Sequence, residues 1–230
     1  MRVAPTSIDE VFLDAKRADP RIRDLMRLAA ERGLRTLVVD AERLDGMAHQ
    51  GRHQGVVASV RAIGHQLGSL DDLLDSVSGP PLLLVLDGVT DPHNLGACLR
   101  VADAAGVHAV IAPKDRAAGI SATVSKVASG AAETMPYFMV TNLARTLGEL
   151  KEREIWVVGM ADEAEVDLYG AAIPSAITWV LGAEGGGLRR LTRERCDALV
   201  RIPMFGQVES LNVSVAAGIC LYESCRRRSA

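Results

Sequence analysis

The chain has 230 residues, of which 48% are hydrophobic and 24% are charged, and its formal net charge is -3. This composition is ordinary for a globular protein with a sizeable core, and the small net charge neither favours nor excludes a nucleic-acid partner. No apolar run approaches the roughly 18 residues of a membrane-spanning helix, and the N-terminus has no signal segment, so we expect a cytoplasmic protein with no membrane association.

The first 63 residues have the pattern of a small α/β unit. The stretch PRIRDLMRLAAERG, residues 20–33, predicts a helix because it begins at a proline and ends at a glycine. Short apolar runs on either side of it predict strands: EVFLDA, RTLVVD and GVVASV. Residues 64–81 are rich in glycine and serine and end in a double proline, which indicates a linker with room for one short helix.

From residue 82 to residue 230 the pattern becomes regular and predicts a second domain. Continuous apolar runs alternate with helical segments, which is typical of a mainly parallel sheet covered on both faces. In such sheets ligands bind at the carboxyl ends of the strands, so the informative residues should follow the runs. The runs are LLLVLD, VHAVIA, PYFMV, IWVVGM, ITWVLG and ALVRIP.

The loop after LLLVLD leads into a helix that begins near Asp91 and Pro92. Leu95, Leu99 and Ala102 form its expected buried stripe, and Arg100 lies beside that stripe. A solvent-exposed helix arginine is the simple interpretation of Arg100, and a functional arginine is the alternative.

The loop after ITWVLG is rich in glycine and reads AEGGGLRRL, with Glu184 among the glycines. Glycine allows a backbone approach that side chains would block. A nucleotide-phosphate loop does not fit, because the lysine and serine or threonine of a Walker motif and the glycine spacing of a dinucleotide fingerprint are both missing. A plain glycine turn therefore remains an alternative to a ligand-binding loop.

The stretch FGQVESLNVSVAAGICLYE, residues 205–223, changes from a polar loop into an apolar helical pattern. Ser210 is the expected N-cap of a helix that carries Leu211, Val215 and Ile219. This cap does not explain Asn212, which we expect in the first turn and whose side chain can hold a polar group of a ligand.

The cysteines are few and scattered, and they have neither paired short spacings nor neighbouring histidines. We therefore expect neither a disulfide framework nor a metal site. The four positions are Cys98, Cys196, Cys220 and Cys225.

Three long motifs occur in order, each after a predicted strand: DGVTDPHNLGACLRVADAAGV, LGAEGGGL and IPMFGQVESLNVSVAAGI. Together they resemble the SpoU (TrmH-type) family of RNA ribose 2'-O-methyltransferases in the SPOUT superclass, over nearly all of residues 82–225. The segments PKDR and RRLTRE are similar to the branch of this family that methylates a guanosine ribose 2'-hydroxyl in 23S rRNA.

The resemblance implies a parallel α/β domain with a deep trefoil knot, an exception to the rule against threaded chains. It implies that S-adenosylmethionine binds in the knot, held around Gly182, Ile202 and Leu211. It also implies a homodimer, and the small residues that we expect at the contact are Val213, Ala216, Ala217 and Cys220.

The catalytic roles that the resemblance implies fall on Asn94, Arg100, Glu184, Ser210 and Asn212. Arg100 would address the ribose hydroxyl. An arginine keeps its proton up to a pKa above about 12, so we expect it to orient the hydroxyl and stabilise the alkoxide rather than act as a base. No metal is needed, because methyl transfer from a sulfonium depends mainly on alignment.

The family pattern also places a strand and a helix before SIDEVFLDA, residues 7–15. The resemblance therefore implies an L30e-like RNA-binding unit that lacks its first elements. Three other functions stay open: methylation of tRNA, an RNA-binding assembly factor without catalysis, and a nicotinamide dehydrogenase. The missing dinucleotide fingerprint argues against the last.

Overall fold

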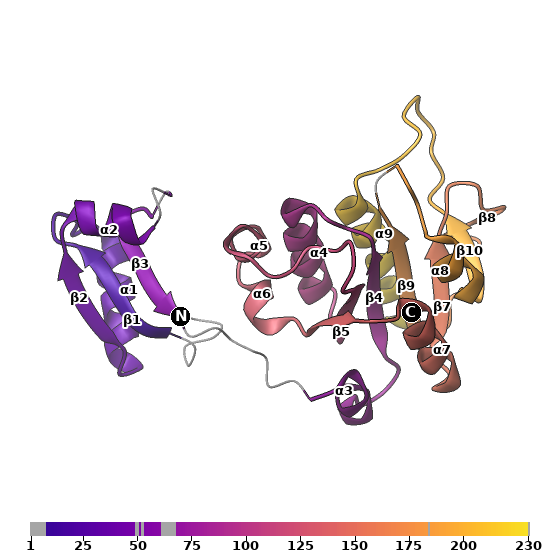
Figure 1. Ribbon diagram of the computed structural model, residues 1–230, viewed down its shortest axis with the longest axis horizontal. Coiled ribbons are helices and arrows are strands. Elements are labelled where there is room, and N and C mark those ends of the chain that lie inside the picture. The colour runs from indigo at the N-terminus through magenta and orange to yellow at the C-terminus, as the bar shows by residue number, and fades with distance from the viewer. Residues whose placement is uncertain (1–7, 49–50, 52, 61–67, 184, 230) are drawn as a thin grey trace. The chain divides into compact units, whose positions relative to one another are not determined.

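The computed structural model describes residues 8–48, 51, 53–60, 68–183 and 185–229, and the chain divides into two compact units (Figure 1). The first unit spans Met1–Gln66 and the second spans Leu67–Ala230. Each unit has its own buried core.

The N-terminal unit has a three-stranded sheet of order β2-β1-β3. Strand β1 is central, and it pairs in parallel with β2 and antiparallel with β3. Its small core contains Val11, Leu13 and Ile22. The predicted strands and helix are confirmed, and the elements are β1 (Ile8–Asp14), α1 (Pro20–Glu31), β2 (Arg35–Val39), α2 (Ala41–Met47) and β3 (Val56–Val60).

The C-terminal unit is built on a seven-stranded sheet of order β6-β5-β4-β9-β7-β10-β8, in which the recorded pairings are all parallel. Six strands match the apolar runs, and the two-residue strand β8 was not predicted because it is too short to produce a pattern. The bounds are β4 (Leu82–Asp87), β5 (Ala109–Pro113), β6 (Tyr137–Val140), β7 (Trp156–Met160), β8 (Val166–Asp167), β9 (Ile177–Gly182) and β10 (Ala198–Arg201). The knot stays a prediction.

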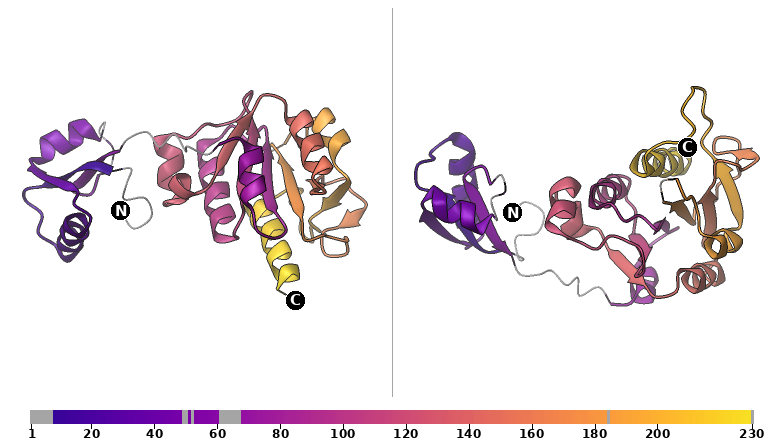
Figure 2. Two further views of the ribbon diagram at one scale, coloured as in Figure 1. Left: turned by 90° about the horizontal axis from the view of Figure 1, so that it is seen from below. Right: turned by 45° about the horizontal axis from the view of Figure 1, so that its top comes forward.

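Helices cover both faces of this sheet, as Figure 2 shows. Strand β4 shows why its sequence is continuously apolar: alternate side chains point to opposite faces, and both faces are buried. Leu84 packs in the core beneath α4 (Pro92–Ala104), α5 (Ala122–Ala128), α6 (Ala131–Thr134) and α9 (Val213–Arg228). Leu83 packs in the opposite core with α3 (Leu70–Ser76) and α7 (Leu143–Glu152), and α8 (Arg190–Arg195) contacts α7.

Helix α9 begins later than the sequence pattern predicted. Its N-cap is Asn212, whose side chain accepts a hydrogen bond from the backbone N–H of Ser214 at 2.9 Å, so the assignment of Ser210 as the cap was wrong. Of the residues predicted on this helix, Leu211 precedes it, whereas Val215 and Ile219 lie on it, and Val215 is 50% exposed. The shifted start moves the buried side to Val213, Ala217, Cys220 and Leu221.

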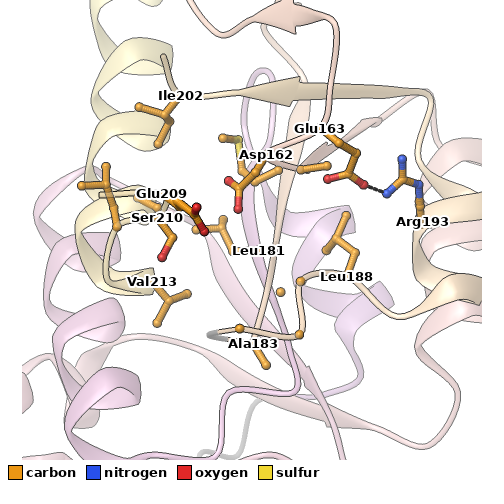
Figure 3. A pocket seen from close by; sticks show the side chains of 18 of the residues that line it. Asp162, Glu163, Leu181, Ala183, Leu188, Arg193, Ile202, Glu209, Ser210 and Val213 are labelled. Atoms are coloured by element: carbon orange, nitrogen blue, oxygen red, sulfur yellow. Dashed lines mark ion pairs between the residues drawn. The ribbon is translucent and has the colours of Figure 1, made fainter. Parts of the chain in front are cut away.

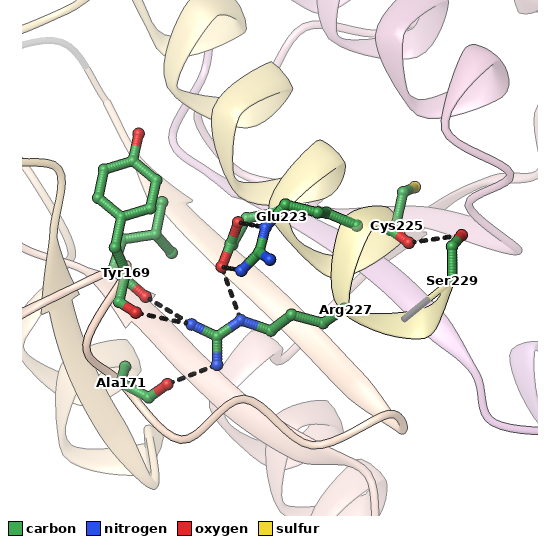
Figure 4. Close-up of polar contacts among 8 residues, drawn as sticks. Tyr169, Ala171, Glu223, Cys225, Arg227 and Ser229 are labelled. Atoms are coloured by element: carbon green, nitrogen blue, oxygen red, sulfur yellow. Dashed lines mark hydrogen bonds and ion pairs between the residues drawn. The ribbon is translucent and has the colours of Figure 1, made fainter.

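The C-terminal end of α9 is anchored by arginines, as Figure 4 shows. Arg227 donates to the carbonyl oxygens of Ala171 at 2.7 Å and Tyr169 at 3.0 Å, and it pairs with the buried Glu223 at 2.6 Å. Arg228 donates to the carbonyl of Pro81 at 2.8 Å. The arginine cluster at residues 226–228 therefore does more than complement the helix dipole, because it satisfies backbone carbonyls from segments far away in sequence.

The four cysteines are free thiols. None of the helices in the described part of the chain is both long enough and apolar enough to span a bilayer. Within the described ranges, no group of three or more histidine, cysteine or acidic side chains is arranged to hold a metal ion.

Candidate active site

A cavity of about 440 Å³ lies where three loops follow the parallel strands β7, β9 and β10 (Figure 3). Residues 160–163, 181–183, 185–188, 202, 204 and 209–211 line it, together with Arg193 of α8 and Val213 and Ala216 of α9. Because parallel strands place their carboxyl ends at one edge, loops distant in sequence meet there. The predicted cofactor residues Gly182, Ile202 and Leu211 all line this cavity, and so does Ser210.

The glycine-rich loop that follows β9, called the glycine loop below, folds back on itself within a few residues. The N–H of Gly187 donates to the carbonyl oxygen of Ala183 at 3.0 Å, and Gly185 and Gly187 have φ angles of +72° and +59°. A Cβ on Gly182 would lie 2.1 Å from the backbone carbonyl of Gly187. Glycine is therefore required at residue 182 by the chain's own backbone, before any ligand is considered.

A buried carboxylate holds this loop against the end of β4. Asp87 lies opposite Gly182 in the register of β4 and β9, and its side chain is fully buried. It accepts the backbone N–H of Arg189 at 3.0 Å and lies 3.3 Å from the guanidinium of that residue. Arg189 also donates to the carbonyl of Asp115 at 3.1 Å. One arginine thus connects the end of β4 with the loops that follow β5 and β9, and the buried Asp87 carboxylate depends on this partly exposed charged partner.

The cavity is also lined by acidic side chains that were not predicted as site residues. Figure 3 shows the carboxylates of Asp162 and Glu209 in the cavity, while Glu163 forms an ion pair with Arg193 of α8. Asp162 and Glu163 come directly after β7. Their position after a parallel strand is the sequence signal that predicts them, because ligands bind at the carboxyl ends of such strands.

The first and third sequence motifs meet through a side-chain hydrogen bond. The amide nitrogen of Asn212 donates to the amide oxygen of Asn94 at 2.8 Å. The oxygen of Asn212 accepts from the backbone N–H and the hydroxyl of Ser214, at 2.9 and 2.6 Å. Asn212 therefore caps α9 and links it to the first turn of α4, which explains why an asparagine stands at this position.

The structure gives less support to the other predicted catalytic residues. Arg100 lies on the exposed side of α4 and is not one of the residues that line the cavity; its guanidinium contacts the hydroxyl of Ser129 at 3.3 Å. Glu184 lies outside the described residues. The catalytic roles of Asn94, Arg100, Glu184, Ser210 and Asn212 stay predictions.

The cysteines near the sheet are poor nucleophiles. Burial, with a smaller contribution from the charge of Asp197, raises the pKa of Cys196 to about 12. Burial also raises the pKa of Cys220 well above its ordinary value. Because the thiolate is the reactive form, neither residue favours covalent catalysis by sulfur.

Comparison with known families gives two matches that together cover both units. Residues 81–222 match the SpoU rRNA Methylase family. Residues 2–65 match the family described as RNA 2'-O ribose methyltransferase substrate binding.

The chain is similar along most of its length to bacterial proteins named 23S rRNA (guanosine-2'-O-)-methyltransferase RlmB. It is 65% identical to the protein from Ralstonia nicotianae, over 97% of this chain and 89% of the relative. It is 59% identical to the protein from Bordetella pertussis, over 99% of this chain and 93% of the relative.

Two solved structures have the same fold. A crystal structure of an RNA 2'-O ribose methyltransferase matches with a TM-score of 0.80 and 27% identity, covering 97% of this chain and 82% of the other. The SpoU methyltransferase AviRb from Streptomyces viridochromogenes, in complex with the cofactor AdoMet, matches with a TM-score of 0.79 and 24% identity, over 99% of this chain and 87% of the other.

Proposed function

Because the chain belongs to the SpoU rRNA methylase family, we propose that it transfers a methyl group from S-adenosylmethionine to a guanosine ribose 2'-hydroxyl in 23S rRNA. The observation that carries this proposal is the 65% identity to a relative with that named activity, which extends through both units. The alternatives of a dehydrogenase and of a protein without catalysis have no comparable support.

The cavity beside the glycine loop suits the methyl donor in size and charge. At about 440 Å³ it is in the range of small-molecule sites. S-adenosylmethionine supplies an electrophilic methyl group on a positively charged sulfonium. The carboxylates of Asp162 and Glu209 complement a cation, and the backbone near Gly182, Ile202 and Leu211 would hold the adenosine.

In the proposed reaction, the protein aligns the ribose hydroxyl and stabilises the charge that develops on its oxygen. Arg100 would donate hydrogen bonds to that oxygen, and an RNA phosphate would take the proton, since a guanidinium cannot act as a base near neutral pH. The Asn212 to Asn94 hydrogen bond supports this arrangement by joining the two helix ends. Glu184 would help Asn94 to position Arg100 and the knot loops, and Ser210 would help Asn212 to fix the site near the methyl donor.

We also propose that the enzyme is cytoplasmic and that it forms a homodimer, the latter as the resemblance implies. The contact residues expected from the sequence need correction, because Val213, Ala217 and Cys220 are buried in the core of their own chain. The exposed apolar side chains on α9 are instead Val215 and Tyr222, at 50% and 52% exposure. They are two turns apart and therefore lie on one side of the helix.

The proposed activity is tested with methyl-labelled S-adenosylmethionine and RNA transcribed in vitro. We expect label in 23S rRNA as one alkali-resistant linkage that contains a 2'-O-methylguanosine, and no label in tRNA. Label on a base, or only on tRNA, would contradict the substrate assignment. Binding of the cofactor with no transfer to either RNA would favour an assembly factor.

A further inference from the structure

The N-terminal unit contains a second cavity, of about 380 Å³, which the proposed function does not use. It lies where the loop after β1 and the start of α1 meet the turn before β3. Its floor is apolar, formed by Ile22, Leu25 and Val56. Polar groups surround the floor: Arg17, Asp19, Arg21, His53 and Gln54.

The guanidinium of Arg17 is held in place beside this floor. It donates to the carbonyl oxygen of Gln54 and forms an ion pair with Asp19 at 2.7 Å. A Cβ on Gly55 would lie 2.4 Å from Cδ of Arg17, so a larger residue there would displace the arginine side chain. The donors of a guanidinium lie in its plane, so these contacts leave its flat face for stacking. The side chain remains 41% exposed.

The turn that carries Gln54 is strained and firmly supported. Gln54 has a φ of +52°, which is uncommon for a residue with a side chain. Next to it, Nδ1 of His53 accepts the backbone N–H of Gly55 at 3.1 Å, so its ring hydrogen is on Nε2, which lies 3.0 Å from Asp45. A side chain kept at a strained position next to a cavity suggests a role in binding.

We propose that this cavity binds one unpaired nucleotide of the RNA substrate, with the base stacked on the guanidinium face of Arg17 and contacted by the Gln54 amide. The inference rests on the proposed function, because it assigns a site for the same substrate. Proteins commonly recognise RNA through splayed bases that stack on aromatic rings or arginine planes, with hydrogen bonds to the base edge. A nucleotide fits this combination of apolar floor, flat cation and amide better than a phosphate ion does.

The test measures binding of the full-length protein to labelled 23S rRNA transcribed in vitro. Arg17→Ala should weaken binding by about tenfold, while the affinity for S-adenosylmethionine stays unchanged. Arg17→Lys should bind as weakly as Arg17→Ala, since lysine keeps the charge but has no flat face. The matched control is Arg35→Ala, because Arg35 pairs with Glu10, away from the cavity and nearer the start of β1.

A second variant separates binding from folding. Gln54→Gly suits the positive φ and should raise the midpoint of thermal unfolding, yet it should weaken RNA binding. Arg17→Ala with the same affinity as Arg35→Ala, or wild-type affinity in Arg17→Lys, would overturn the proposal. If the wild-type protein transfers methyl groups to 23S rRNA, either of these results would contradict only the nucleotide site proposed in this cavity. If the wild-type protein transfers none, the proposed function itself would be contradicted.

Discussion

The two ends of helix α9 both carry polar side chains, but those at one end lie at the cavity and those at the other end bond the chain's own backbone. At the N-terminal end, Asn212 hydrogen-bonds Asn94 of another motif, and Ser210 lines the cavity. At the C-terminal end, Glu223 is only 6% exposed, and Arg227 donates to backbone carbonyl oxygens. Polar groups taken up by the chain's own backbone build the fold, whereas polar groups that line a cavity are available to a ligand. Substitutions at the two ends should therefore separate activity from stability.

The largest effect on activity should come from Arg100 of α4, the residue proposed to contact the ribose hydroxyl. Arg100→Ala should lower the rate of methyl transfer by roughly two to four orders of magnitude, a loss of about 3 to 5 kcal/mol of transition-state stabilisation. Cofactor affinity, measured by calorimetry, should stay within a few-fold. Arg100→Lys tests bidentate positioning, and substantial recovery of the rate would argue against it. An unchanged rate in Arg100→Ala would mean that Arg100 is only a surface residue.

Gly182→Ala should weaken S-adenosylmethionine binding by about a hundredfold or more, because the new Cβ would meet the carbonyl of Gly187 and push the glycine loop away from β9. The comparison variant is Gly148→Ala in α7, where a Cβ would have nothing within 4 Å. Calorimetry measures affinity, and circular dichroism checks that both variants fold. Normal affinity in Gly182→Ala would show that the glycine loop is not part of the cofactor site.

At the anchored end, Arg227→Gln should lower the free energy of unfolding by about 2 kcal/mol, since two backbone carbonyl oxygens lose their charged donor and the buried Glu223 loses one of its two arginine partners. The rate of methyl transfer below the unfolding temperature should change by less than about twofold. This is far less than the loss expected when an active-site group is removed. Arg145→Gln is the control, because Arg145 is 77% exposed, its partner Glu149 is 46% exposed, and a surface pair contributes little. A rate loss as large as that of Arg100→Ala would remove the distinction between the two ends.

Asn212→Ser sharpens the comparison at the opposite end. Serine keeps an oxygen for the helix cap but cannot donate an amide hydrogen to Asn94. Methyl transfer should fall by about tenfold, while the free energy of unfolding changes by less than about 1 kcal/mol. Urea unfolding and single-turnover transfer measure the two quantities. A fall in stability with an unchanged rate would make Asn212 a structural residue like Arg227.

The smallest effect should be a pH dependence at Glu223. Hydrogen bonds from Arg226, opposed by burial and aided by Arg227, lower its pKa from 4.5 to about 2. Since the folded pKa is depressed, the stabilisation is complete above about pH 4.5 and is lost as the pH falls toward 2. Glu223→Gln should be less stable by about 1 kcal/mol at pH 7, and the difference should shrink at pH 3. A constant difference in urea unfolding at both pH values would contradict this origin.

Local sequence patterns determined much of the fold and part of the site. The apolar runs that became β4 and β9, and the proline and glycine that bound α1, depend on the backbone within a few residues, so the sequence reveals them directly. The rule that ligands bind after parallel strands predicts the loops of Gly182, Ile202 and Ser210, and residues of all three line the cavity.

Only the tertiary structure decided where α9 begins and which of its faces is buried, since Asn212 rather than Ser210 is the cap once Asn94 lies beside it. It also decided that Asp87 meets Arg189, that Arg228 reaches Pro81, and that Asp162 and Glu209 share a cavity. These partners lie far apart along the chain, and the order β4-β9-β7-β10 brings them together. Periodicity describes the face that one segment presents, whereas contacts between segments depend on which strands become neighbours in the folded sheet.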